Sequence, residues 1–228
     1  MWITDFLNLF FPNNCQACGK PLVRKENIIC LSCLYKLPKT NFHFHINNPI
    51  SRIFWGRANI HAATSFLFFN KGGNVQNLIH QLKYRGNTET GRHLGELLGK
   101  DLKKSNLFNN IDLIIPVPLH PKKLHKRGFN QSEVIAEGIG YAMDVPVNAD
   151  ELQRTEHTET QTKKTRYTRW ENVKGKFRVV NPENLAGKNI LLIDDVLTTG
   201  ATLESCAQTL LEVPKTIVSI ATLAYAQV

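Results

Sequence analysis

The sequence lacks any run of about 18 apolar residues, the length a helix needs to cross a bilayer. It also lacks a Walker loop, a G-x-G-x-x-G segment and a recognisable Ser-His-Asp set. These absences argue against a membrane-spanning protein, a P-loop nucleotidase, a Rossmann dinucleotide enzyme and a serine hydrolase. With 228 residues, 42% of them hydrophobic, the chain can form one well-cored domain and a small appendage.

The N-terminal stretch "MWITDFLNLFFPNNC" is poor in basic charge and contains Asp5, which is not typical of a signal peptide. We expect an amphipathic opening helix there, with Trp2, Phe6, Leu9 and Phe10 on one side. The protein is therefore expected to be cytoplasmic.

The formal net charge is +9. Such an excess suits an anionic partner, either nucleic acid or a phosphorylated small molecule. The charge alone does not choose between them, because many basic proteins bind neither.

Four of the five cysteines form two C-x-x-C pairs separated by 11 residues: Cys15, Cys18, Cys30 and Cys33. This spacing predicts a structural zinc ribbon or knuckle, because four thiolates suit tetrahedral zinc. A cytoplasmic location disfavours two disulfides, and a redox pair does not explain two copies. An iron-sulfur cluster remains an open alternative. The fifth, Cys206, lies in an apolar helical stretch and is expected in the core.

The remaining sequence alternates strand-like and helix-like segments, which predicts a mostly parallel sheet covered on both faces, a doubly wound α/β fold. We place a four-cysteine zinc module at residues 1–45 and the α/β domain at 46–228. Strands are expected at 60–69, 112–118, 189–194 and 216–226. Helices are expected at 75–82, at 132–143 with Ser132 as N-cap, and at 201–212.

The stretch "LLIDDVLTTGATL", residues 191–203, carries the clearest chemistry. A buried strand would end at two carboxylates, Asp194 and Asp195, and a loop from Val196 to Gly200 would lead into a helix. Loop amides, threonine hydroxyls and the helix start would form an anion cradle, and the acids could accept hydrogen bonds from neighbouring sugar hydroxyls. The alternative is a plain turn in which Thr199 caps the helix.

This stretch resembles the 5-phosphoribosyl-1-pyrophosphate (PRPP) motif of type I phosphoribosyltransferases: apolar residues, two acids, a variable pair and T-T-G-x-T. The resemblance implies that Asp194 and Asp195 hold the ribose hydroxyls and are the catalytic acids. It implies Mg²⁺ bound with PRPP. It also implies a 5′-phosphate site formed by Thr198, Thr199, Gly200, Ala201 and Thr202.

Three more segments, with the four-cysteine module, resemble the ComF family of competence proteins: "LKYRGN" (82–87), "PVPLHPKKLHKRGFNQSE" (116–133) and "RTEHTETQTKKTRYTRWENVKGKF" (154–177). The resemblance therefore spans nearly the whole chain, and it implies a role in DNA uptake. One departure is that Lys123 and His125 lie where family members often have arginines.

A second strand-to-helix loop is basic, and the resemblance implies that it holds pyrophosphate. Arg127 is the best candidate, because its guanidinium binds an oxyanion with two hydrogen bonds. Lys122, Lys123 and Lys126 are candidates for pyrophosphate or nucleic acid, and the alternative is a solvated basic face. Asn130 and Gln131 would face the acceptor or cap the next helix. The charge of the segment Lys83, Tyr84 and Arg85 would reach the pocket or cap the end of the preceding helix.

Residues 153–176 form a long polar stretch that is either a lid over PRPP or a nucleic-acid arm. Arg166, Arg169 and Trp170 are the nucleic-acid candidates there, because cations beside an aromatic ring suit single-stranded DNA. The sequence thus predicts a protein that binds PRPP, with single-stranded DNA and the DNA-uptake machinery as partners. The alternative is a phosphoribosyltransferase of nucleotide salvage, acting on a small base or amine.

Overall fold

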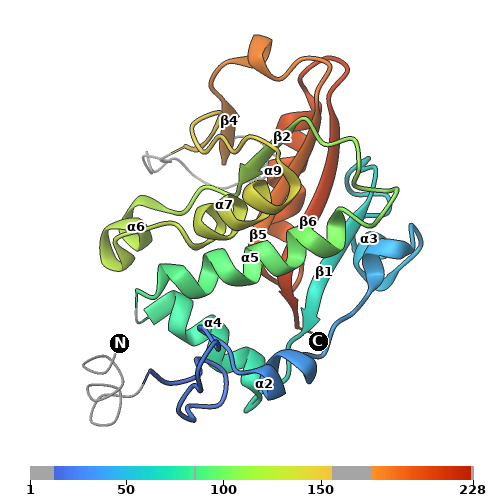
Figure 1. Ribbon diagram of the computed structural model, residues 1–228. Coiled ribbons are helices and arrows are strands. Elements are labelled where there is room, and N and C mark those ends of the chain that lie inside the picture. Colours follow the sequence, from blue (N-terminus) through green and yellow to red (C-terminus); the bar gives the residue numbers. More distant parts are fainter. Residues whose placement is uncertain (1–12, 85, 156–175, 227–228) are drawn as a thin grey trace.

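Four parallel strands form the central sheet of the computed structural model, which describes residues 13–84, 86–155 and 176–226 (Figure 1). Their order across the sheet is β1 (Ala63–Phe68), β6 (Ile217–Tyr225), β5 (Asn189–Leu197) and β2 (Leu113–Pro116). Every neighbouring pair runs parallel. The expected mostly parallel α/β sheet is therefore confirmed, and each expected strand overlaps an observed one.

Helices cover both faces of this sheet, as its apolar sequences require. In β5, Leu191 and Ile193 point into one core, with α4 (Asn74–Tyr84), α5 (Thr88–Leu102) and α7 (Gln131–Met143). Ile190 and Leu192 point into the other, with α3 (Pro49–Ile53) and α9 (Ala201–Leu211). Because successive residues of a strand face opposite sides, this alternation places both cores directly against the functional strand.

The helices α5 and α7 pack backbone to backbone. A Cβ added to Gly95 would lie 2.2 Å from the carbonyl oxygen of Ile135, and one added to Gly138 would lie 2.1 Å from that of Arg92. This close packing fixes the start of α7 above the carboxyl half of β5, where the acid pair lies.

Shorter elements complete the described structure: α2 (Leu31–Tyr35), η1 (Phe42–Phe44), α6 (Pro121–Arg127), β3 (Leu152–Arg154), β4 (Phe177–Val179) and η2 (Pro182–Asn184). The strands β3 and β4 pair antiparallel, which joins the two ends of the long polar stretch. Most of that stretch, with Arg166, Arg169 and Trp170, lies outside the described residues, as does the expected opening helix.

Two local predictions were wrong. The N-cap of α7 is Asn130, whose side chain accepts a hydrogen bond from the backbone N–H of Ser132. Ser132 is instead inside the helix, and its hydroxyl is available for another partner. The strand β5 continues to Leu197 and so includes the first two residues of the expected loop, because Val196 and Leu197 still pair with β6.

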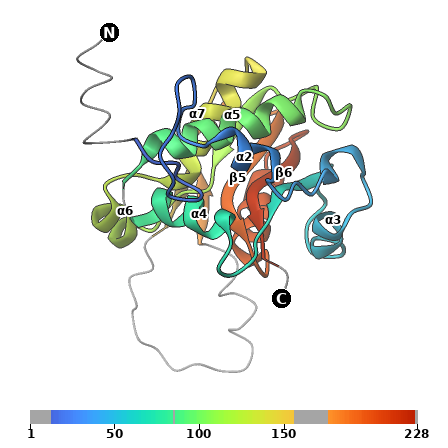
Figure 2. The same cartoon turned by 60° about the horizontal axis from the view of Figure 1, so that its bottom comes forward.

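The N-terminal segment packs directly on the larger fold. Cys15, Ala17 and Cys33 are buried in the same core as α4 and α5, and Figure 2 shows the segment (dark blue) lying against α4. Lys39 bridges antiparallel to Leu67 at the edge of β1. The boundary at residue 45 stays a prediction.

Among the helices of the described residues, none has the length and apolarity needed to cross a membrane.

Candidate functional site

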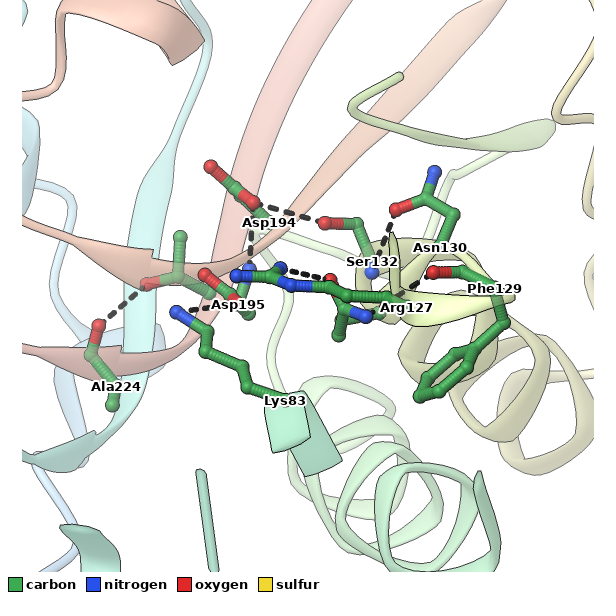
Figure 3. Close-up of polar contacts among 10 residues, drawn as sticks. Lys83, Arg127, Phe129, Asn130, Ser132, Asp194, Asp195 and Ala224 are labelled. Carbon is green, nitrogen blue, oxygen red and sulfur yellow. Dashed lines mark hydrogen bonds and ion pairs between the residues drawn. The ribbon is translucent and has the colours of Figure 1, made fainter. Parts of the chain in front are cut away.

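The two acids of β5 lie side by side in its carboxyl half and have partners from different helices (Figure 3). Asp194 Oδ1 accepts hydrogen bonds from Ser132 Oγ at 2.9 Å and from the backbone N–H of Asp195 at 2.8 Å. Asp195 Oδ2 lies 2.7 Å from Lys83 Nζ at the end of α4. Strand β5, α4 and α7 therefore converge on one small acidic site.

Burial and the neighbouring charge of Asp195 raise the pKa of Asp194 to about 7. The hydrogen bonds from Asp195 and Ser132 and the charge of Lys83 act in the opposite direction and are outweighed. Near neutral pH, Asp194 therefore exchanges a proton easily, and its hydrogen-bonding role changes with its ionisation.

This raised pKa predicts a pH-dependent stability difference. Between about pH 4 and pH 7 the folded state retains a proton on Asp194 that the unfolded chain releases, so wild-type stability falls as pH rises through this window. Asp194→Asn removes that loss and should gain on the order of a few kcal/mol relative to wild type by about pH 8. Urea unfolding of both proteins across the window measures the gain. A stability difference that stays constant with pH would contradict a raised pKa.

A short loop follows β5 and leads into α9. Thr198 and Thr199 are exposed, whereas Gly200 is buried with a φ of +76°, a conformation that glycine adopts without strain. Gly200 is the N-cap of α9 and provides no side chain to its first amide groups. Together with Asp194, residues 196–203 line a small cavity of about 50 Å³. Free amides and hydroxyls around such a hollow suit an anion.

Arg57, which follows α3 in the chain, supports this loop through two polar contacts. Its Nη1 donates to the carbonyl oxygen of Thr199 at 3.2 Å, and its Nη2 pairs with Glu204 in the first turn of α9. A Cβ on Gly200 would lie 2.9 Å from Ile53, so α3 also packs closely on the loop. No local sequence pattern indicates this role, because Arg57 precedes Thr199 by 142 positions.

The predicted basic loop forms α6, and the residue that caps its C-terminal end is Gly128, with a φ of +79°. Arg127 donates a hydrogen bond to the side chain of Gln131 and lies 5.8 Å from the ring centroid of Tyr84. The remaining basic candidates, Lys122, Lys123 and Lys126, are exposed. Arg127 is therefore held beside the end of α4, next to Lys83.

The structure answers the two questions that the sequence left open nearby. Asn130 caps α7 and donates to the carbonyl oxygen of Val117 at 3.0 Å, and Gln131 bonds Arg127 and Phe129. Both amides thus support the fold around the site. Lys83 reaches the acid pair.

The four cysteines of the N-terminal segment form a second candidate site, for a metal. Their sulfur atoms all lie within 4.8 Å of one another, and none of the four forms a disulfide. Four thiolates around zinc, with Zn–S bonds of about 2.3 Å, place their sulfur atoms about 3.8 Å apart. The observed cluster fits that spacing.

Hydrogen bonds favour the thiolate form of Cys15, whereas burial and the neighbouring cysteines raise the pKa of Cys33. Although burial opposes ionisation, backbone N–H groups of Cys30, Cys18 and Ala17 lower the pKa of Cys15 to about 7. The side chain of Asn74 lies 3.5 Å from Cys33 Sγ. Such donors around the sulfur atoms orient metal ligands.

The helix α4 connects the two candidate sites. Near its start, Asn74 contacts Cys33, and Asn77 donates to the carbonyl oxygen of Ala17 at 2.8 Å. At its end, Lys83 pairs with Asp195 and Tyr84 lies against Arg127. The cysteine cluster thus supports the helix that completes the acidic site.

Residues 124–227 match the model of the phosphoribosyl transferase domain. The DNA utilization protein YhgH of Escherichia coli (strain K12) is 28% identical over 201 residues, which cover 86% of this chain and 83% of that protein. Competence protein F of Haemophilus influenzae is 30% identical over 137 residues, 58% of this chain and 60% of that protein. Competence protein ComFC of Bacillus subtilis is 35% identical over 100 residues, 44% and 38% of the two chains.

Solved structures of phosphoribosyltransferases are more distant. The glutamine PRPP amidotransferase from B. subtilis aligns with a TM-score of 0.44 and 19% identity, over 63% of this chain and 30% of that chain. The similarity to this domain therefore rests on the sequence matches. Residues 124–227 are thus similar to the phosphoribosyl transferase domain, and the chain as a whole is similar to proteins named for DNA utilization and competence.

Proposed function

We propose that this protein binds PRPP, with Mg²⁺, at the carboxyl end of β5. The observation that carries the proposal is the acid pair Asp194–Asp195 placed beside the amide-rich loop at the start of α9. The loop would take the 5′-phosphate and the acids would accept hydrogen bonds from the ribose hydroxyls. Mg²⁺ prefers oxygen ligands and would enter bound to the phosphate groups of PRPP.

Arg127 and Lys83 would bind the pyrophosphate side. Lys83 contacts Asp195, and Arg127 of α6 lies against Tyr84 at the same end of α4, so their charge complements a ligand that carries phosphate at both ends. Lys83 would exchange its contact with Asp195 for one with PRPP as the acid accepts the ribose hydroxyls.

For the cysteine cluster we propose structural zinc. Four cysteines leave no open coordination position for a substrate, so the metal would stabilise the fold.

The proposed biological role is DNA uptake in the cytoplasm, with single-stranded DNA and the uptake machinery as partners. Two observations support it: the net charge of +9 and relatives named DNA utilization protein and competence protein F. Phosphate backbones bind such basic proteins mainly through counterion release.

Calorimetric titration with PRPP and Mg²⁺ tests this site. Repeated titrations that show no heat of binding would refute the proposed PRPP binding. Incubation with labelled PRPP and a panel of bases and amines then tests turnover. Release of pyrophosphate that depends on one acceptor would identify an enzyme of nucleotide salvage. Binding without release would identify a PRPP-binding protein.

Anisotropy titrations of labelled single-stranded DNA at several salt concentrations test the DNA partner. Affinity should fall steeply with salt, with a slope set by the number of phosphates contacted. Absence of binding even at low salt would remove DNA from the proposal and leave the PRPP site intact.

A further inference from the structure

A second hollow, separate from the acidic site, lies at the edge of the sheet beside α3. It has a volume of about 650 Å³ and is formed by residues 46–62, the segment that leads into β1. This volume is within the range of small-ligand sites. Its lining combines Trp55 and aliphatic side chains with Asn47, Asn59, Arg57 and His61.

The exposure of Trp55 to solvent is unusually high for a tryptophan. Its side chain is 60% exposed at the rim of the hollow. Tryptophan is on average one of the more buried residues, since its large apolar ring is costly to leave in water. An exposed tryptophan ring at a hollow therefore indicates a partner with a flat apolar face.

The charge around this ring is positive. The guanidinium of Arg52 lies 5.8 Å from the centroid of the Trp55 ring. Arg52 has no carboxylate partner within the described residues, and no acidic side chain is among those lining the hollow. Arg57, in contrast, is neutralised by Glu204. Arg52 is therefore the cation available to a phosphate.

Polar groups are also available inside the hollow. The side chains of Asn47, Asn59 and His61 have no hydrogen-bond partner in the part of the chain that the structure describes. Amide and imidazole groups can donate to or accept from the edge of a base. A flat ring, a free cation and free polar groups are the features that hold an unpaired nucleotide.

We propose that this hollow is a docking site for single-stranded DNA, with one base stacked on Trp55 and its phosphate bound by Arg52. The inference rests on the proposed handling of DNA and identifies where one strand is held. A duplex is disfavoured, because its bases are already stacked on one another and do not offer a face to the ring. The site lies outside the long polar stretch that contains Trp170.

The test uses the full-length protein and labelled oligodeoxythymidine, read by fluorescence anisotropy. Trp55→Ala should weaken binding about 5- to 150-fold, the loss of one stacked base, and Trp55→Phe should retain most of the affinity. Arg52→Ala should reduce the slope of log affinity against log salt by about 0.7, the value for one phosphate contact. The matched control is Tyr141→Ala, which removes an aromatic ring that is 81% exposed on α7. It should bind like wild type.

Calorimetry with PRPP confirms that each variant is folded, because none of these residues lies in the acidic site. Equal DNA affinity of wild type and Trp55→Ala would overturn the docking site while the DNA function stands. Equal losses in Trp55→Ala and Tyr141→Ala would also overturn it. If the wild-type protein does not bind the oligonucleotide, the DNA function and the docking site fail together.

Discussion

Cys15→Ser should abolish stoichiometric metal binding and unfold the N-terminal segment. Purified wild-type protein is expected to contain about one zinc per chain, as four ligands require. In zinc-finger peptides a structural zinc supplies about 10–16 kcal/mol of apparent folding free energy. Elemental analysis measures the metal, and limited proteolysis followed by mass spectrometry locates the unfolded segment.

Loss of the metal should also affect the acidic site. Because α4 contacts the cysteine cluster at its start and carries Lys83 at its end, loss of the metal should also weaken PRPP binding. The central sheet should remain folded, since its two cores are built mainly from other residues. Ser32→Ala is the matched control, because Ser32 is exposed between two of the cysteines. Purified protein that contains disulfides and no zinc would rule out this role.

The double variant Asp194→Asn, Asp195→Asn should lose most of its affinity for PRPP. A buried charge-assisted hydrogen bond contributes roughly 1.5–3 kcal/mol, so each substitution should weaken binding about ten-fold or more. The two effects should not simply add, because the acids are adjacent and Asp195 also holds Lys83. Calorimetry with PRPP and Mg²⁺ measures the change.

Asp144→Asn provides the control for this experiment. Asp144 is exposed after α7 with a φ of +61°, a conformation that asparagine tolerates well. The control should bind PRPP like wild type. Thr199→Val, which removes a hydroxyl donor in the loop, should weaken binding by a smaller factor. Unchanged affinity of the double variant would refute the proposed ribose contacts.

The features that could be predicted from sequence are those encoded by neighbouring residues. The apolar runs at 189–194 and 216–226 each lie in a buried strand, because a strand covered on both faces excludes polar residues from its centre. The acid pair, the loop and the start of α9 occupy one stretch of 13 residues, so their proximity follows from chain connectivity. The two cysteine pairs are likewise short local turns.

The residue that caps the start of α7 could not be predicted from the sequence. Asn130 and Ser132 are both good N-caps, and local sequence does not rank them. The tertiary structure favours Asn130, whose amide also reaches the carbonyl oxygen of Val117. That choice leaves the Ser132 hydroxyl to bond Asp194.

Local sequence is enough to predict the alternation of strands and helices, the acid pair with the loop that follows it, and the cysteine pairs, because each depends on residues close together in the chain. Three contacts follow from tertiary packing alone: Lys83 pairs with Asp195, Arg57 supports the loop, and α4 joins the cysteine cluster to the acids. These contacts join residues that are far apart in sequence. They exist because the helices pack on the sheet at one relative position, which no local pattern encodes.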